Sequence, residues 1–259
     1  MKPFVLVLAL ALVSACSRQT GSVDGQKKTE TASTAAPPTG EQIEPGAIEA
    51  LARMGAYLRT VKQFEVSART SIDEVLTDTD QKVTFAGQNT YRVRRPNAFF
   101  LEANTDRRHR QFFYDGSTIT IYSPRMKVYA QRPAPPTIRE TVDAMQDYGI
   151  RVPLADLFYW ASEPLSTGDF QLASRIGYAR MDGQEADQYA FRQGDIDWQV
   201  WIARGDRPLP LKVVVNSRTE VAQPTYSAEL HWNLKPSFSD KTFAFRAPAD
   251  VHQIRIASQ

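Results

Sequence analysis

The chain has 259 residues, of which 42% are hydrophobic and 23% charged, and its formal net charge is +2. Acidic and basic residues are mixed along the chain without a basic stripe, which argues against a nucleic acid as partner. The single cysteine, Cys16, excludes a disulfide within the chain, so stability must come from a buried core.

Residues 1–15 have the pattern of a secretory signal peptide, with Lys2 followed by an apolar run. The run is too short to form a stable membrane-spanning helix. It ends in Val-Ser-Ala-Cys, which resembles the bacterial lipobox, in which the cysteine is diacylated. We therefore expect Cys16 to anchor the protein, because several acyl chains on one residue hold a protein durably on a membrane. The alternative is an ordinary signal peptide with an incidental cysteine.

The residues after Cys16 predict location and tethering. An Asp at the next position retains enterobacterial lipoproteins at the inner membrane, so Ser17 predicts the periplasmic side of the outer membrane. Residues 16–43 are polar and cannot bury enough surface to offset the entropy of ordering, so we expect a disordered tether. The alternative is that this segment docks on the domain. Residues 44–259 are expected to form one folded domain.

The domain begins with one expected helix and a run of expected strands. Residues 45–61 place apolar side chains at helical spacing behind Pro45, which suits an early helical turn. Between Phe64 and Ile72 apolar and polar residues alternate, as in a half-buried strand. Further strands are predicted at residues 81–85, 89–94 and 98–104, before a polar turn at residues 105–109.

Residues 112–130 give the clearest local signal, a β-meander. Asp115-Gly116 predicts a type I′ turn, because both central positions of that turn need a positive φ. Pro124 suits the second turn, since proline has no N–H for a strand ladder. Ile119 and Ile121 share one face of the middle strand, and we expect them to point into the interior.

Two helices are expected after a proline-rich break at residues 132–136. Thr137 and Glu140 fit a capping box for a helix over residues 137–148. Gly149 is placed to end that helix. Residues 153–160 predict a shorter and more apolar helix, whose composition suits either a lid or a plug.

The last third of the domain returns to β structure. Strands are predicted at residues 177–181, 186–192, 198–203, 211–217 and 225–232, with a further alternation at Phe243 and Phe245. The total is ten or eleven strands, so the expected fold class is mainly β with α (α+β). No repeat of fixed period is present, which argues against a solenoid or propeller.

Catalytic and metal-binding patterns are absent from the sequence. The histidines at positions 109, 231 and 252 have no second ligand at metal spacing. There is neither a Gly-x-Ser-x-Gly elbow nor a Walker loop. Asp195 and Asp197 have the composition of a glycosidase pair, but they flank a glycine turn and fit a solvated hairpin end better. We therefore expect no catalytic residue, no metal and no cofactor.

Apolar side chains on strand and helix faces are the remaining candidates for function. They can form a packed β core or line an apolar cavity of the kind that curved antiparallel sheets enclose, and the residue pattern leaves both possibilities open. The residues predicted to line the cavity or its lid are Phe64, Val66, Tyr91, Val93, Phe99, Phe113, Ile119, Ile121, Tyr129, Val142, Met145, Leu157, Phe158, Trp160, Trp198 and Val200.

Residues 94–124 resemble the LolA/LolB lipoprotein-carrier superfamily. They contain Arg-Pro-Asn-x-Phe, followed after a strand by Asp-Gly-x-Thr-x-x-x-Tyr-x-Pro. The whole chain is more similar still to a family of predicted periplasmic proteins placed in that superfamily. That similarity rests on Tyr-Asp-Gly (114–116), Gly-Ile-x-x-Pro-Leu-Ala-Asp-Leu (149–157), Asp-Trp-Gln-x-Trp-Ile (197–202) and Pro-Leu-Pro-x-Lys (208–212).

The resemblance implies an incomplete antiparallel β-barrel whose concave face is covered by helices and can hold acyl chains. Residues 137–148 and 153–160 would then be the lid. The framework positions would be Arg95, Pro96, Asp115, Gly116 and Pro124. The soluble carrier of the superfamily has no lipid anchor, and the anchored receptor lacks the Asp-Trp-Gln-x-Trp-Ile segment, so a shared fold does not establish a shared task.

Two functional hypotheses follow from the sequence, with an enzyme as a third and weaker one. The first is a membrane-anchored cell-envelope protein that binds lipid or lipoprotein acyl chains and has no catalytic step. The second is an envelope sensor or scaffold that binds a protein partner through the sheet edge or the lid.

Overall fold

The computed structural model describes residues 42–164, 168 and 170–255. The predicted signal peptide, Cys16 and nearly all of the predicted tether therefore lie outside the described residues. The elements are α1 (Pro45–Thr60), β1 (Gln63–Val75), β2 (Lys82–Arg94), β3 (Ala98–Thr105), β4 (His109–Tyr114), β5 (Thr118–Ser123), β6 (Val128–Pro133), α2 (Ile138–Asp147), α3 (Asp156–Trp160), β7 (Leu172–Met181), β8 (Gln184–Gln193), β9 (Ile196–Ala203), β10 (Pro210–Ser217), β11 (Thr225–Asn233), the 3₁₀ helix η1 (Asp240–Thr242) and β12 (His252–Gln253).

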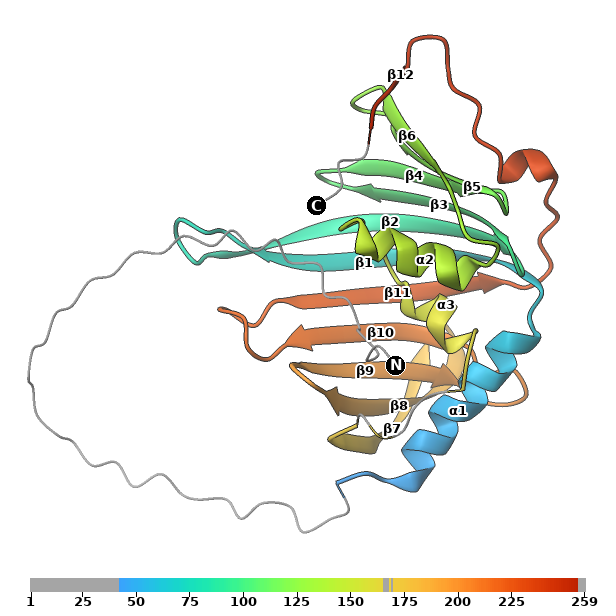
Figure 1. The fold of residues 1–259 in the computed structure, drawn as a ribbon. Coiled ribbons are helices and arrows are strands. Elements are labelled where there is room, and N and C mark those ends of the chain that lie inside the picture. The colour runs from blue at the N-terminus through green and yellow to red at the C-terminus, as the bar shows by residue number, and fades with distance from the viewer. Residues whose placement is uncertain (1–41, 165–167, 169, 256–259) are drawn as a thin grey trace, which may run out of the picture.

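All the strands belong to one open sheet, in the order β12-β6-β5-β4-β3-β2-β1-β11-β10-β9-β8-β7. The pairs are antiparallel except for β12, which runs parallel to β6. Helices α1, α2 and α3 lie on one face of this curved sheet, as Figure 1 shows. The predicted fold class, a mainly β chain with an incomplete barrel and helices over the concave face, is confirmed.

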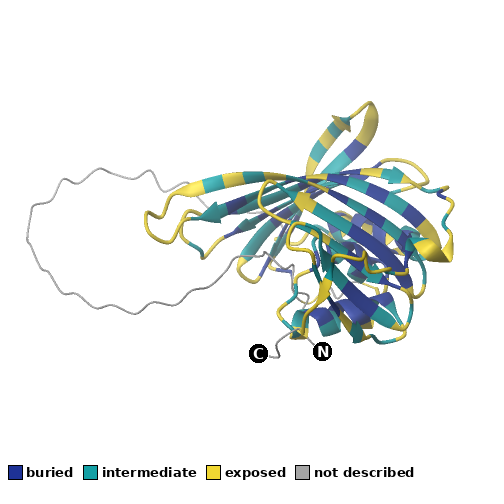
Figure 2. Cartoon of the chain, turned by 90° about the horizontal axis from the view of Figure 1, so that it is seen from above, coloured by how far each residue is buried: buried dark blue, intermediate teal, exposed yellow. Residues whose placement is uncertain are grey.

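The main core lies between the concave face of the sheet and the three helices. It includes Leu51, Met54 and Leu58 from α1 and extends across the sheet from β5 to β7. Buried and less buried residues alternate along the strands, which is the period-2 pattern of a sheet with two unlike faces (Figure 2). Gly55 lets α1 approach α3 closely, since a Cβ there would lie 3.0 Å from the Trp160 carbonyl oxygen.

Two strand predictions need correction. Residues 81–85 and 89–94 belong to the single strand β2, because the ladder with β1 continues through residues 86–88. Phe243 and Phe245 do not form a strand. They follow η1, where Phe243 is buried against Ala98 and Phe100 on the convex face of the sheet.

The first turn of the meander differs from the predicted type I′ turn. Only Gly116 adopts a positive φ there, at 101°, and the Asp115 carboxylate accepts hydrogen bonds from the N–H groups of Ser117 and Thr118, both at 2.9 Å. The Asp115 N–H donates to the Thr118 carbonyl, so Gly116 is the first central residue of this turn. A positive φ at that position is typical of a type II′ turn. Asp182 and Gly183, between β7 and β8, do both adopt a positive φ.

Candidate functional site

The structure places most of the predicted cavity residues on the concave face. In β5, Ile119 lies opposite Tyr114 and Ile121 opposite Phe112, and all four belong to the main core or pack against it. The predicted inward direction of Ile119 and Ile121 is therefore confirmed. The predicted residues that are buried in this core are Phe64, Val66, Tyr91, Val93, Phe99, Ile119, Val142, Met145, Leu157, Phe158, Trp160, Trp198 and Val200, and Ile121 is partly buried against it.

Phe113 and Tyr129 were predicted to line the cavity, and that prediction is wrong. Both side chains lie on the convex face and contact the ring of Phe245, at centroid distances of 5.3 and 4.9 Å. The reason is the strand period, because Phe113 lies opposite Thr120 and not opposite Ile119 or Ile121.

Phe112 and Tyr114 are the concave-face residues that sequence reasoning missed on this strand. Both are buried in the main core. The signal that identifies them is the parity of β4: residues opposite Ile119 and Ile121 must share their face.

Aromatic side chains of α3 pack against the concave face of the sheet. The ring of Trp160 from α3 stacks on Trp198 of β9 at a centroid distance of 6.0 Å, and Phe158 lies 5.6 Å from Phe99 of β3. The helices thus occupy the space that the sequence left open as either core or cavity.

Helices α2 and α3 form one unit, here called the lid (residues 137–160). The Tyr159 hydroxyl donates to Asp143 at 2.7 Å, and Arg139 pairs with the same carboxylate at 3.2 Å. These polar groups join α2 to α3. Towards the sheet the lid presents apolar side chains, together with hydrogen bonds such as Tyr91 hydroxyl to the Pro153 carbonyl at 3.1 Å.

The ends of α2 are well defined, and the joint with α3 is strained. The Thr137 hydroxyl accepts the Glu140 N–H at 3.2 Å, so the Thr137 half of the predicted capping box is present. The Glu140 carboxylate accepts the Thr137 hydroxyl at 2.7 Å. Gly149, at a φ of 70°, ends the helix as predicted. Leu154 adopts a φ of 49°, a left-handed conformation that costs a bulky residue of order 1–3 kcal/mol.

Burial sets the ionisation of Asp156, the first residue of α3. Removal from water raises the pKa of this carboxyl from 3.8 to about 7. Its Oδ1 atom is enclosed and has no hydrogen-bond partner among the described residues. The lid therefore carries a carboxyl group whose charge changes near neutral pH.

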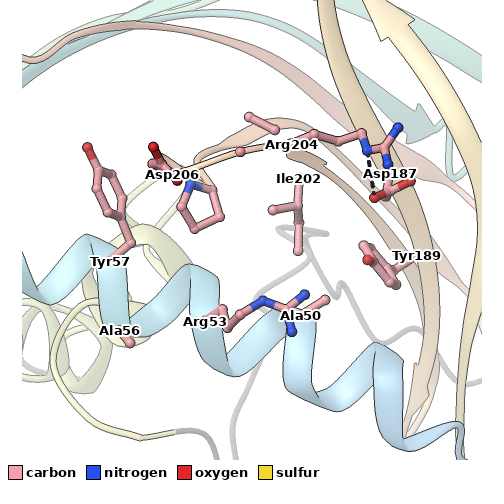
Figure 3. Close-up of a pocket in the computed structure, with 12 residues that line it drawn as sticks. Ala50, Arg53, Ala56, Tyr57, Asp187, Tyr189, Ile202, Arg204 and Asp206 are labelled. Atoms are coloured by element: carbon pink, nitrogen blue, oxygen red, sulfur yellow. Dashed lines mark ion pairs between the residues drawn. The ribbon is translucent and has the colours of Figure 1, made fainter.

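Two hollows lie away from the predicted cavity residues. One of about 410 Å³ separates α1 from the ends of β8 and β9, with Arg53 and Tyr57 on the helix side and Tyr189 and Arg204 on the sheet side (Figure 3). Asp187 pairs there with Arg204 at 3.5 Å. The other, of about 300 Å³, is lined by Glu65, Arg92, Asn233, Pro236, Ser237, Phe238 and Thr242. Neither hollow is lined by a residue predicted for the cavity.

Strand β7 forms one edge of the sheet and carries exposed apolar side chains. Ile176 is 56% exposed and Tyr178 53% exposed. The ladder with β8 is irregular between Arg175 and Gly177, which places a bulge at Ile176. The short strand β12 forms the other edge of the sheet and pairs with only part of β6.

Two of the polar residues considered from the sequence, His109 and Asp197, have structural partners. His109 bonds to Glu102 at 2.7 Å, and the Arg192 guanidinium lowers the pKa of Asp197, which it contacts at 2.6 Å. Within residues 42–164, 168 and 170–255, no three His, Cys, Asp or Glu side chains come together as metal ligands. No helix in that part of the chain is long and apolar enough to cross a membrane.

The protein belongs to the class of open, mainly antiparallel sheets whose apolar concave face is covered by helices. Residues 47–257 match the model of the DUF2092 family, described as predicted periplasmic proteins. The chain belongs to this family, as the resemblance in its sequence motifs predicted. A search of curated proteins finds no match.

Several solved structures are similar to this chain. An uncharacterized conserved protein from Thermus thermophilus is 13% identical, with a TM-score of 0.46 over 81% of this chain and 99% of its own. The lipoprotein LppX of Mycobacterium tuberculosis is 10% identical, with a TM-score of 0.46 over 75% and 98%. A LolA superfamily protein, NE2245 from Nitrosomonas europaea, is 10% identical, with a TM-score of 0.36 over 77% and 97%.

Proposed function

We propose that this protein binds lipid or lipoprotein acyl chains on the concave face of its sheet, in the cell envelope and without a catalytic step. The proposal rests on the way in which the lid, α2 and α3, covers that face. The lid has polar contacts of its own between α2 and α3, and it covers an apolar sheet through side chains such as Val142, Phe158 and Trp160. An acyl chain would take the place of these side chains.

Opening the lid has a free-energy cost that an acyl chain can offset in part. The lid buries nine apolar side chains, and at about 1.5–3 kcal/mol for each large one their burial keeps the lid closed over an empty sheet. An acyl chain with about fifteen methylene groups would contribute about 12 kcal/mol on burial, which offsets a large part of the cost of opening. The nine side chains are Ile138, Val142, Met145, Val152, Leu154, Ala155, Leu157, Phe158 and Trp160.

The proposal includes the location of the protein. Membership of a family of predicted periplasmic proteins supports a place in the cell envelope. Acylation of Cys16 would add a membrane anchor, and Ser17 favours the outer membrane. Residues 16–43 would then be the tether, and residues 44–259 the single domain that reaches the ligand.

Native mass spectrometry of the Cys16→Ser protein tests acyl binding, because no attached chain then competes for the sheet. We expect a lipid of about one acyl-chain unit to copurify and a fluorescent fatty-acyl probe to bind saturably. A consistently bare protein that takes up no probe would contradict the proposal. Phe113→Ser, on the convex face, is the matched control and should leave probe uptake unchanged.

The β7 edge supports a second candidate, the binding of a protein partner. Residues 42–44 already pair with Ala173, and the Arg175 N–H donates to the Glu44 carboxylate. Beyond Arg175 the edge can offer N–H and C=O groups to an added strand, and Ile176 and Tyr178 provide exposed apolar contacts there. A photo-crosslinker at position 178 should then trap one stoichiometric envelope protein. Loss of that product in Ile176→Lys, with no lipid in the purified protein, would favour this candidate over the first.

A further inference from the structure

The corner of the sheet beside β12 carries basic side chains from two neighbouring turns. The Arg125 guanidinium, in the β5–β6 turn, donates to the carbonyl oxygens of Thr105 and Asp106 in the β3–β4 turn at 3.2 and 3.3 Å, so the two turns lie side by side. Strand β12 pairs with β6 and brings the C-terminal segment to the same corner (Figure 1). This region is here called the basic corner, and its exposed residues are Arg108, Arg110, Arg125, Met126, Lys127 and Ile254.

The two turns and the residues next to β12 contain two acidic side chains, and both have partners. Asp250 accepts a hydrogen bond from Lys127 Nζ at 2.6 Å. The Asp106 carboxylate accepts one from the Ala86 N–H at 2.9 Å. The basic side chains of the corner outnumber these two carboxylates, so the corner keeps a net positive charge.

Three arginines of the basic corner lack a counter-ion. In the part of the chain that the structure describes, no carboxylate lies within ion-pair distance of Arg108, Arg110 or Arg125. Their neighbour Arg107, by contrast, pairs with Glu74 at 2.8 Å. Side chains of like charge that share one corner repel each other, so an anionic surface would stabilise their arrangement.

Exposed apolar side chains lie among these cations. Met126, in the β5–β6 turn, is 72% exposed, the largest fraction among the large hydrophobic side chains that the structure describes. Ile254 is 48% exposed, and its N–H donates to the Tyr129 carbonyl at 2.8 Å, close to that turn. Such a mixture is typical of a surface that lies in the interface of a membrane, where apolar atoms enter between the head groups and cations meet the phosphates.

The basic corner and the start of the described chain lie at opposite edges of the sheet. The Glu44 N–H donates to the Ala173 carbonyl on β7 at 2.8 Å, whereas β12 forms the other edge. Neighbouring strands lie about 4.8 Å apart, so the sheet extends over roughly 50 Å between these edges. Residues 16–41 can span roughly 90 Å when fully extended. An anchor at Cys16 would therefore leave the basic corner free to reach the same membrane.

We infer that the basic corner contacts an anionic phospholipid surface, with Met126 between the head groups and the three unpaired arginines next to their phosphates. This contact lies outside the concave face, so it goes beyond the proposed acyl binding and does not depend on it. An acidic protein is the alternative partner, and it would leave the corner without affinity for lipid.

Binding to vesicles tests the inference. The chain to use is residues 16–259 with Cys16→Ser, so that neither the predicted signal peptide nor an attached acyl chain contributes. We expect it to sediment with vesicles of phosphatidylcholine and phosphatidylglycerol, but not with vesicles of phosphatidylcholine alone, and added salt should release it. Equal binding to the two kinds of vesicle, or binding to neither, would overturn the inference.

Single substitutions locate the contact. Arg108→Gln should weaken binding to the anionic vesicles about fivefold, which corresponds to the ~1 kcal/mol that one basic side chain contributes near such a surface. Met126→Ser should weaken it as well. Arg180→Gln and Ile176→Ser, on β7, are the matched controls at the opposite edge and should leave binding unchanged.

An equal loss in Arg108→Gln and Arg180→Gln would show that net charge alone drives the binding and would overturn the inference. Uptake of a fluorescent acyl probe should be the same in all four variants, because none of them changes the concave core. The membrane contact and the proposed acyl binding can therefore fail independently.

Discussion

The two faces of the sheet are built from the same strands, yet they are covered in opposite ways. On the concave face, three helices bury aromatic and aliphatic side chains completely. On the convex face, neighbouring strands carry ion pairs, such as Arg92 with Glu65 at 2.8 Å and Lys212 with Glu229 at 3.1 Å. The convex face is stable in water as it stands, whereas the concave face needs a cover. In the proposed function, an acyl chain takes the place of the helices on the concave face.

The largest effect is expected from a charge placed on the concave face. Ile119→Asp puts a carboxylate into the main core, where it has no partner, and should cost more than about 4 kcal/mol or prevent folding. Gln131→Asp on the neighbouring strand is exposed and should change the free energy of unfolding by less than about 1 kcal/mol. Urea denaturation measures both. Unchanged stability and lipid uptake in Ile119→Asp would mean that the two faces are assigned the wrong way round.

The next largest effect concerns pH and Asp156 in the lid. The folded protein holds this proton up to pH about 7, whereas the unfolded chain releases it near 3.8. Between these values the folded state binds more protons, so the free energy of unfolding falls as pH rises, by up to about 4 kcal/mol.

Denaturation of wild type and Asp156→Asn at several pH values between 4 and 8 measures this effect. We expect the variant to lose most of the decline, because the amide does not ionise. Subtraction of the two profiles removes the titration of every other group that the substitution leaves alone. Parallel profiles would show that Asp156 ionises alike in the folded and unfolded states.

A smaller effect is expected at the start of α2. Thr137→Ala removes the hydroxyl that accepts the Glu140 N–H, which typically costs about 1 kcal/mol of helix stability. Hydrogen exchange should become faster in residues 138–147, while the β-strands keep their protection. Thr137→Ser keeps the cap and serves as the control. Faster exchange in both variants alike would show that the cap does not hold the lid.

The smallest effect is expected on the convex face. Arg69 contacts Glu229 at 3.5 Å in an exposed ion pair, and such pairs contribute about 0–1 kcal/mol. Arg69→Ala should therefore lower the midpoint of thermal unfolding only slightly and should leave probe binding unchanged. A loss of acyl binding in this variant would end the functional contrast between the two faces.

Local patterns in the sequence predicted much of this fold. Alternation predicted β1 and the inward direction of Ile119 and Ile121, and the Thr137 cap and Gly149 predicted the bounds of α2. These features depend on neighbours in the chain, so their physical causes can be read locally. The family motifs predicted the helix-covered concave face that no local pattern contains.

Features set by contacts distant in sequence were not predictable. The parallel strand β12 and the burial of Phe243 depend on the return of the C-terminal segment to β6 and β3. The wrong face for Phe113 is a different kind of error, because its partner Thr120 lies just across the predicted hairpin and strand parity places Phe113 opposite to the face of Ile119 and Ile121.

Hydrogen exchange of the Cys16→Ser protein, with and without a saturating lysophospholipid, tests the central claim most directly. If an acyl chain replaces the lid on the concave face, residues 138–160 should exchange faster in the complex, while β1, β2 and β11 remain protected. Binding of lipid with unchanged exchange in residues 138–160 would contradict the account.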